Sequence, residues 1–158
     1  MKQKIYIETS VISYLVANTS KDLVIAAHQA STVDMWNQID EFDVFISDMV
    51  IQESSRGDKK QSCDRLNKLK NIPALKIDDE AKKLAKALLD GKAIPEKCPE
   101  DALHISVAAI NGIDVIITWN FKHINNPFTR KMIRTIIESK GIVCPEICSP
   151  EELIGENL

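Results

Sequence analysis

The most informative stretch of the sequence is Lys4-Ile5-Tyr6-Ile7-Glu8-Thr9-Ser10, close to its start. Its apolar run ends on the carboxylate of Glu8, and two residues with hydroxyl side chains follow. This order predicts a buried strand that passes into a helix, which Thr9 or Ser10 is able to cap. Ligands bind in open α/β sheets at the edge where the strands end. Because a carboxylate beside a buried strand is costly without a partner or a metal, Glu8 is a candidate functional residue.

The rest of the chain alternates short apolar runs with segments of helical periodicity. Strands are expected at residues 4–7, 43–47, 75–77, 114–118 and 142–147. Helices are expected at residues 22–40, 48–55, 59–70, 80–89, 99–111 and 127–140. Such alternation predicts an α/β fold with a parallel sheet that helices cover on both faces.

Length and composition limit the class of protein. At 158 residues we expect a single domain over residues 1–158, and the apolar content of 44% is ordinary for a globular protein. The net charge of −3 argues against a general polyanion binder, so any contact with nucleic acid must come from a local patch. No apolar run is long enough to span a bilayer, and the first is too short for a secretion signal. We therefore expect a cytoplasmic protein with no membrane partner.

The cysteines are Cys63, Cys98, Cys144 and Cys148. Their spacing matches no zinc-binding pattern. Thiols stay reduced in the cytoplasm, so we expect free cysteines, although the spacing leaves a bridge between Cys144 and Cys148 open.

Four polar residues stand near strand ends or on the helices that follow: Glu8, Glu53, Asp101 and Asn120. Because the carboxyl ends of parallel strands gather on one edge, Glu8 and Asn120 are expected there directly. Asp101 joins them if its helix begins at that edge, and Glu53 joins them if its helix packs beside it. Carboxylate and amide oxygens suit Mg²⁺ or Mn²⁺, and such an ion activates water and neutralises charge on a phosphodiester.

Three of these residues also have a simpler structural role open to them. Asp101 in the first turn of a helix favours the helix dipole, and Glu53 on a surface helix would be a solvated charge. Asn120 after a strand is a common turn residue. A phospho-acceptor site of the receiver type is excluded, because it needs an aspartate where Glu8 stands and a lysine at a strand end.

The chain as a whole resembles the PIN domain family, and most closely its VapC-like toxin nucleases of type II toxin–antitoxin systems. The resemblance rests on ordered segments that are, from first to last, Ile5-Tyr6-Ile7-Glu8-Thr9-Ser10-Val11-Ile12, Val50-Ile51-Gln52-Glu53, Glu100-Asp101-Ala102-Leu103-His104-Ile105-Ser106-Val107-Ala108, Ile117-Thr118-Trp119-Asn120-Phe121-Lys122-His123-Ile124 and Pro145-Glu146-Ile147-Cys148-Ser149-Pro150-Glu151-Glu152-Leu153. Each segment alone is a weak signal, but together they cover nearly the whole chain in the right order.

The resemblance implies a three-layer α/β/α sandwich whose parallel sheet has about five strands. It also implies a ribonuclease that hydrolyses RNA with Mg²⁺ or Mn²⁺, and an antitoxin protein and a second copy of the chain as partners. The family's metal-binding positions correspond to Glu8, Glu53, Asp101 and Asn120, and the supporting hydroxyls would be Thr9, Ser10 and Thr118.

Two departures from the family pattern bear on activity. Glu8 is one methylene longer than the usual aspartate, and Asn120 lacks a negative charge, so a second metal would bind more weakly. The alternative is therefore a catalytically weak or silent PIN-domain module that binds nucleic acid or a partner protein.

Candidate RNA contacts are His104, Trp119 and Lys122. His104 lies three residues after Asp101 and so shares its helix face, where it would touch phosphate or support the site. The structural alternative for His104 is a packed, hydrogen-bonded histidine, and the alternative for Trp119 is a core residue. Met35 and Trp36 are expected on the exposed side of the helix at 22–40, which in related toxins contributes to the dimer and antitoxin surface. Ordinary core packing is the alternative for Trp36.

Overall fold

The computed structural model describes residues 1–155, so residues 156–158 of the expected domain lie outside the described residues. Its strands are β1 (Lys4–Ile7), β2 (Asp43–Ser47), β3 (Ala74–Leu75), β4 (Val115–Ile117) and β5 (Glu146–Cys148). They form one sheet in the order β3-β2-β1-β4-β5, and every neighbouring pair is parallel. The predicted parallel sheet of about five strands is therefore confirmed.

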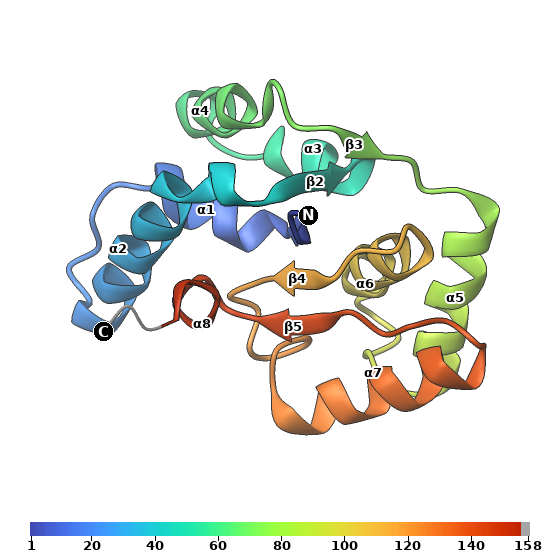
Figure 1. Ribbon diagram of the computed structural model, residues 1–158. Helices are drawn as coiled ribbons and strands as arrows, with labels where there is room; N and C mark the ends of the chain where they lie inside the picture. Colours follow the sequence, from blue (N-terminus) through green and yellow to red (C-terminus); the bar gives the residue numbers. More distant parts are fainter. Residues whose placement is uncertain (156–158) are drawn as a thin grey trace.

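Helices cover both faces of this sheet. They are α1 (Thr9–Val16), α2 (Leu23–Asn37), α3 (Asp48–Ser54), α4 (Lys59–Leu69), α5 (Asp79–Asp90), α6 (Pro99–Ile110), α7 (Pro127–Ser139) and α8 (Pro150–Ile154), with a 3₁₀ turn at Ile39–Glu41. Figure 1 shows α2 and α8 on one side of the strands and α5 and α6 on the other. The direction of travel along the sheet reverses after β3, so right-handed crossovers place the later helices on the opposite face. The predicted three-layer sandwich is confirmed.

The observed boundaries follow local chemistry. The carboxylate of Asp22 accepts hydrogen bonds from two backbone N–H groups and begins α2, which ends at Asn37 instead of continuing to residue 40. The expected strand at 142–147 is shorter and begins after Pro145, whose nitrogen carries no hydrogen for pairing. The first strand and the second match their expected bounds.

The sheet's central strands are apolar on both faces because helices cover both. Ile5, Tyr6 and Ile7 are fully buried in β1, and Ile116 and Ile117 are fully buried in β4. All four cysteines are free, as expected. Within residues 1–155, no helix is long and apolar enough to cross a membrane.

Candidate functional site

Glu8 lies at the point where β1 passes into α1, and its side chain is only 5% exposed. Glu8 itself is the N-cap residue of α1, and the helix start has no side-chain cap. The expected capping role of Thr9 or Ser10 is therefore wrong. Their hydroxyls bind carboxylates instead: Ser10 donates to Glu8 Oε1 at 2.5 Å, and Thr9 donates to Glu53 Oε1 at 2.6 Å.

A second hydroxyl fixes Glu8 from the neighbouring strand. Thr118, which directly follows β4, is fully buried and donates to Glu8 Oε1 at 2.6 Å. Both hydroxyl donors reach the same carboxylate oxygen. Glu8 Oε2 faces the imidazole of His104, whose Nε2 lies 4.0 Å away.

His104 links the sheet to Glu53 through a chain of buried polar groups. Its Nε2 lies 2.6 Å from Glu53 Oε1, and its Nδ1 lies 2.6 Å from the hydroxyl of Tyr6. The Tyr6 hydroxyl lies in turn 2.7 Å from Ser47 Oγ, at the end of β2. His104 of α6 thus lies between Tyr6 of β1 and Glu53 of α3, and it ties the Glu53 carboxylate to the central strand.

The ionisation states of Glu53 and His104 follow from their contacts. Burial acts to raise the pKa of Glu53, but its hydrogen bond with His104 and the charge of that residue lower the pKa overall. Burial acts to lower the pKa of His104, but the hydrogen bond with Glu53 and the negative charge of Glu8 raise the pKa overall. Both directions favour a protonated imidazole facing ionised carboxylates.

Asp101 stands in the first turn of α6, close enough to Glu8 for their charges to interact. Burial raises the pKa of Asp101, and the charge of Glu8 raises the pKa further. Its Oδ2 lies 3.0 Å from His123 Nδ1, a partner that the sequence did not indicate. Burial and the charge of Glu8 outweigh the charges of His104 and His123, which act to lower the pKa of Asp101, and a bound cation would favour the ionised carboxylate.

We call Glu8, Glu53 and Asp101 the carboxylate group. These residues come from β1, α3 and α6 and offer the oxygen ligands that Mg²⁺ and Mn²⁺ prefer. Ligand atoms of Glu8 and Glu53 lie within 4.8 Å of one another and of a ring nitrogen of His104. Because a protonated imidazole has no lone pair to offer a metal, an ion there would be held by the carboxylate oxygens. The chemistry of the donors fits a hard divalent cation.

Asn120 has the turn geometry that was one of its expected alternatives. Its Oδ1 accepts a hydrogen bond from the backbone N–H of His123 at 3.0 Å, and its own N–H donates to Thr118 Oγ1. Asn120 therefore shapes the loop after β4 and holds His123 in place. A direct metal contact by Asn120 stays a prediction.

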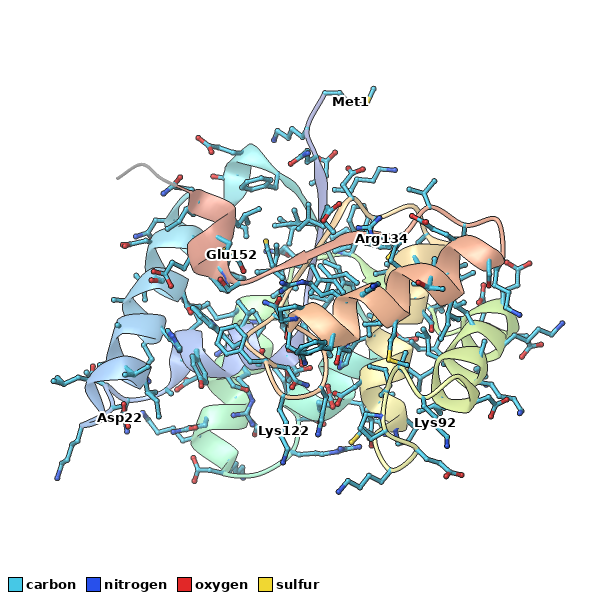
Figure 2. The ribbon with its side chains drawn as sticks, turned by 90° about the horizontal axis from the view of Figure 1, so that it is seen from below. Met1, Asp22, Lys92, Lys122, Arg134 and Glu152 are labelled. Carbon is cyan, nitrogen blue, oxygen red and sulfur yellow. The ribbon has the colours of Figure 1, made fainter. Side chains whose placement is uncertain are left out.

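Two of the candidate RNA contacts need correction. His104 is fully buried, and Trp119 is only 6% exposed. Trp119 stacks on His28 with ring centroids 4.2 Å apart and donates its Nε1–H to Thr32. Buried rings have no free face for a base, so the structural alternatives hold for both residues. Lys122 is exposed, at the opposite end of the molecule from Met1 (Figure 2).

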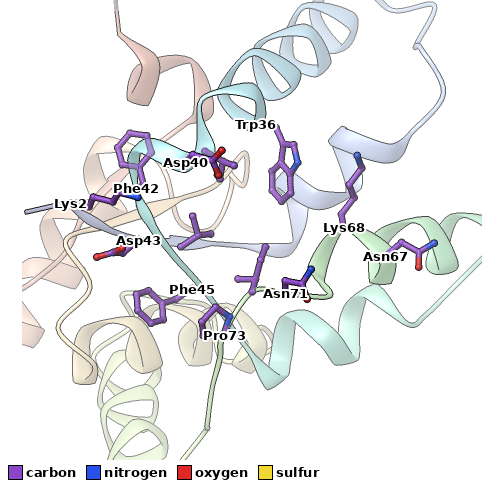
Figure 3. A pocket seen from close by; sticks show the side chains of 13 residues that line it. Lys2, Trp36, Asp40, Phe42, Asp43, Phe45, Asn67, Lys68, Asn71 and Pro73 are labelled. Atoms are coloured by element: carbon purple, nitrogen blue, oxygen red, sulfur yellow. The ribbon is translucent and has the colours of Figure 1, made fainter.

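The helix α2 presents a different apolar surface from the expected one. Met35 is fully buried, whereas Leu23 is 85% exposed and Val24 is 65% exposed. Trp36 is half-buried at the wall of a cavity of about 430 Å³ (Figure 3). This cavity is lined from β2 and the segments around it and includes no residue of the carboxylate group.

Sequence reasoning missed Tyr6, Ser47 and Cys98, and it missed the contact of His123 with Asp101. For Tyr6 a signal was present, because a hydroxyl within an otherwise apolar buried strand needs a hydrogen-bond partner. His123 gave no local signal, since only the fold brings it to Asp101, 22 residues earlier in the chain.

The comparisons with known proteins agree with this architecture. The profile of the family described as the PIN domain matches residues 5–127. A solved structure, VapBC2 from Rickettsia felis bound to a DNA fragment from their promoter, contains a chain of similar fold with a TM-score of 0.58. The identity is 16%, and the match covers 93% of this chain and 98% of that chain. A search of curated proteins gave no match.

Proposed function

The chain belongs to the PIN domain family, and from this premise we propose that it is a metal-dependent endoribonuclease that hydrolyses RNA phosphodiester bonds. PIN domains are generally nucleases that use divalent metals. The observation that carries the proposal is the carboxylate group, which three separate elements bring to one edge of the sheet. Magnesium or manganese, bound there, would lower the pKa of water and neutralise charge on the phosphodiester.

The residues of the chain have distinct tasks in this proposal. Glu8 and Glu53 would hold the cation, with Asp101 as the third carboxylate. Thr118 and Ser10 both donate to Oε1 and so fix the orientation of Glu8, which leaves Oε2 as the oxygen available to a cation. His104 holds Glu53 in place from the buried side and acts as a positioning residue. No side chain is needed as a nucleophile, because water attacks the phosphorus.

The substrate would approach from the exposed loop after β4. Lys122 in that loop is the candidate phosphate contact that remains exposed. A cation there would offset part of the repulsion between RNA and a chain with a net charge of −3.

The finer proposal is that the chain acts in the cytoplasm as the toxin of a toxin–antitoxin pair. Its support is the fold that it shares with a chain of the VapBC2 complex. Leu23 and Val24 on α2 offer exposed apolar surface of the kind that a partner protein covers. Co-purification with the product of the neighbouring gene would test this, and a chain that binds no such product would contradict it.

The nuclease proposal is tested by RNA cleavage with added Mn²⁺. Asp101→Ala should reduce the rate by at least about a hundredfold, while circular dichroism shows an intact fold. The matched control is Asp34→Asn, which alters an exposed carboxylate on α2 and should leave the rate unchanged. Full activity in Asp101→Ala would overturn the assignment. RNA binding without cleavage by the wild type would favour the silent module instead.

A further inference from the structure

A second group of metal-binding side chains lies next to the carboxylate group. Cys98, Asp101 and His123 each offer one ligand atom, and these atoms all lie within 4.8 Å of one another. We call them the Cys98–Asp101–His123 cluster. Its three members are half-buried.

The cluster has a donor set different from that of the carboxylate group. A thiol, an imidazole and a carboxylate are the ligand types that zinc and similar transition metals bind, whereas Mg²⁺ prefers oxygen alone. Three protein ligands leave a fourth position for water, which is the arrangement of an open zinc site.

The spacing of the donors also fits zinc. Cys98 Sγ lies 3.6 Å from His123 Nδ1, and the same nitrogen lies 3.0 Å from Asp101 Oδ2. A tetrahedral ion with the usual zinc–sulfur and zinc–nitrogen bond lengths separates those two donor atoms by about 3.6 Å. His123 Nδ1 lies close to both other donors, and its 3.0 Å contact with Asp101 Oδ2 is a hydrogen bond that zinc would replace, with the two atoms about 3.3 Å apart.

Backbone structure holds each donor in place. Cys98 is the N-cap residue of α6, and Asp101 follows in the first turn of the same helix. His123 lies in the loop after β4, where its backbone N–H donates to Asn120 Oδ1. The donors from the helix and from the loop meet because the loop after β4 contacts the first turn of α6.

We propose that the Cys98–Asp101–His123 cluster binds a zinc-like transition-metal ion, which competes for Asp101 with Mg²⁺ or Mn²⁺ at the carboxylate group. The competition follows from the shared ligand, because Asp101 belongs to both sets. Zinc binding stands on the cluster alone, whereas the inhibition of RNA cleavage rests on the proposed function.

Cobalt is the probe for binding, because Co²⁺ replaces zinc and its thiolate complexes absorb light. Metal-free wild-type protein titrated with Co²⁺ should give a thiolate charge-transfer band that one equivalent of Zn²⁺ abolishes. Cys98→Ser and His123→Gln should each weaken Co²⁺ binding by about tenfold or more. Serine is a favourable N-cap residue, so Cys98→Ser should keep the start of α6 intact.

Two control variants show whether the cobalt band arises at this cluster. Cys63→Ser removes an exposed thiol outside the cluster and should leave the band unchanged. Glu53→Gln alters only the carboxylate group and should retain the band. A wild type without the band, or a band that persists at full strength in Cys98→Ser, would overturn the proposed site.

The competition is measured by RNA cleavage in Mn²⁺ with increasing Zn²⁺. Zinc should inhibit the wild type, and Cys98→Ser should need about tenfold more zinc for the same inhibition. Bound zinc without inhibition would overturn the competition. A wild type that gives the cobalt band but cleaves no RNA would contradict the proposed function and leave the zinc site standing.

Discussion

His104 Nε2 lies 2.6 Å from Glu53 Oε1, in a contact that joins two residues 51 positions apart in the chain. The imidazole is fully buried, and its other nitrogen meets the hydroxyl of Tyr6. Through Tyr6 and His104, the central strand β1 thereby sets the position of the Glu53 carboxylate on α3. Glu53 is therefore a fixed part of the site and not the solvated surface charge that its helix alone would suggest.

From the contact between His104 and Glu53 we predict that the stability of the metal-free protein depends on pH. The pKa of His104 is raised above its ordinary value of 6.5 in the folded chain, since Glu53 and Glu8 outweigh the opposing effect of burial. Its contribution to stability is thus fully present below the unfolded-state pKa, and it is lost as the pH rises through the folded-state pKa. We expect the free energy of unfolding, measured by urea denaturation in EDTA, to fall over that range.

The matched variant is His104→Gln, which keeps a polar side chain but does not titrate. Its free energy of unfolding should be lower at acidic pH and should change less as the pH rises from about 6.5. If the free energies of unfolding of the wild type and His104→Gln changed in parallel with pH, a protonated His104 paired with Glu53 would be contradicted.

Thr118→Val should destabilise the protein by about 1–3 kcal/mol, because it removes a buried hydrogen-bond donor to Glu8 and leaves that carboxylate less satisfied. The substitution keeps the shape of the side chain. Urea denaturation measures the change. Thr135→Val on the exposed surface of α7 is the control, with an expected change within about 0.5 kcal/mol. Equal stabilities for both variants would show that the buried hydroxyl has no special role.

The cysteines should differ strongly in reactivity. Burial raises the pKa of the Cys148 thiol to about 12, and burial likewise raises the pKa of Cys144. At about pH 9, only about one Cys148 in a thousand would be a thiolate, and the thiolate is the reactive form. Iodoacetamide should therefore modify the exposed Cys63 first, as mass spectrometry of timed samples would show. Alkylation of Cys148 as fast as Cys63 would contradict the raised pKa of the Cys148 thiol.

Trp119 should report its burial in fluorescence. In a Trp36→Phe variant it is the remaining tryptophan of the chain, and its emission should be blue-shifted and little quenched by iodide. Added RNA should leave that emission unchanged, because the ring stacks on His28 inside the fold. Strong quenching of this emission by RNA would contradict the buried position and support the RNA contact that the sequence suggested for Trp119.

Much of the fold follows from the sequence because its signals are local. The apolar run before Glu8 and the alternation of strands and helices predict the sheet, and the carboxyl ends of parallel strands place Thr118 beside Glu8. The partners of Asp101 and Glu53 could not be predicted in the same way. They depend on how α6 and the loop after β4 pack, and no local pattern encodes a contact such as that of Asp101 with His123.

The central claim is that the carboxylate group binds a divalent cation, and calorimetric titration of Mn²⁺ into metal-free protein tests it most directly. The wild type should bind Mn²⁺ saturably, and Glu8→Gln should bind it at least about tenfold more weakly. Glu80→Gln, at an exposed position on α5, should match the wild type. Equal Mn²⁺ affinities for the wild type and Glu8→Gln would contradict the account.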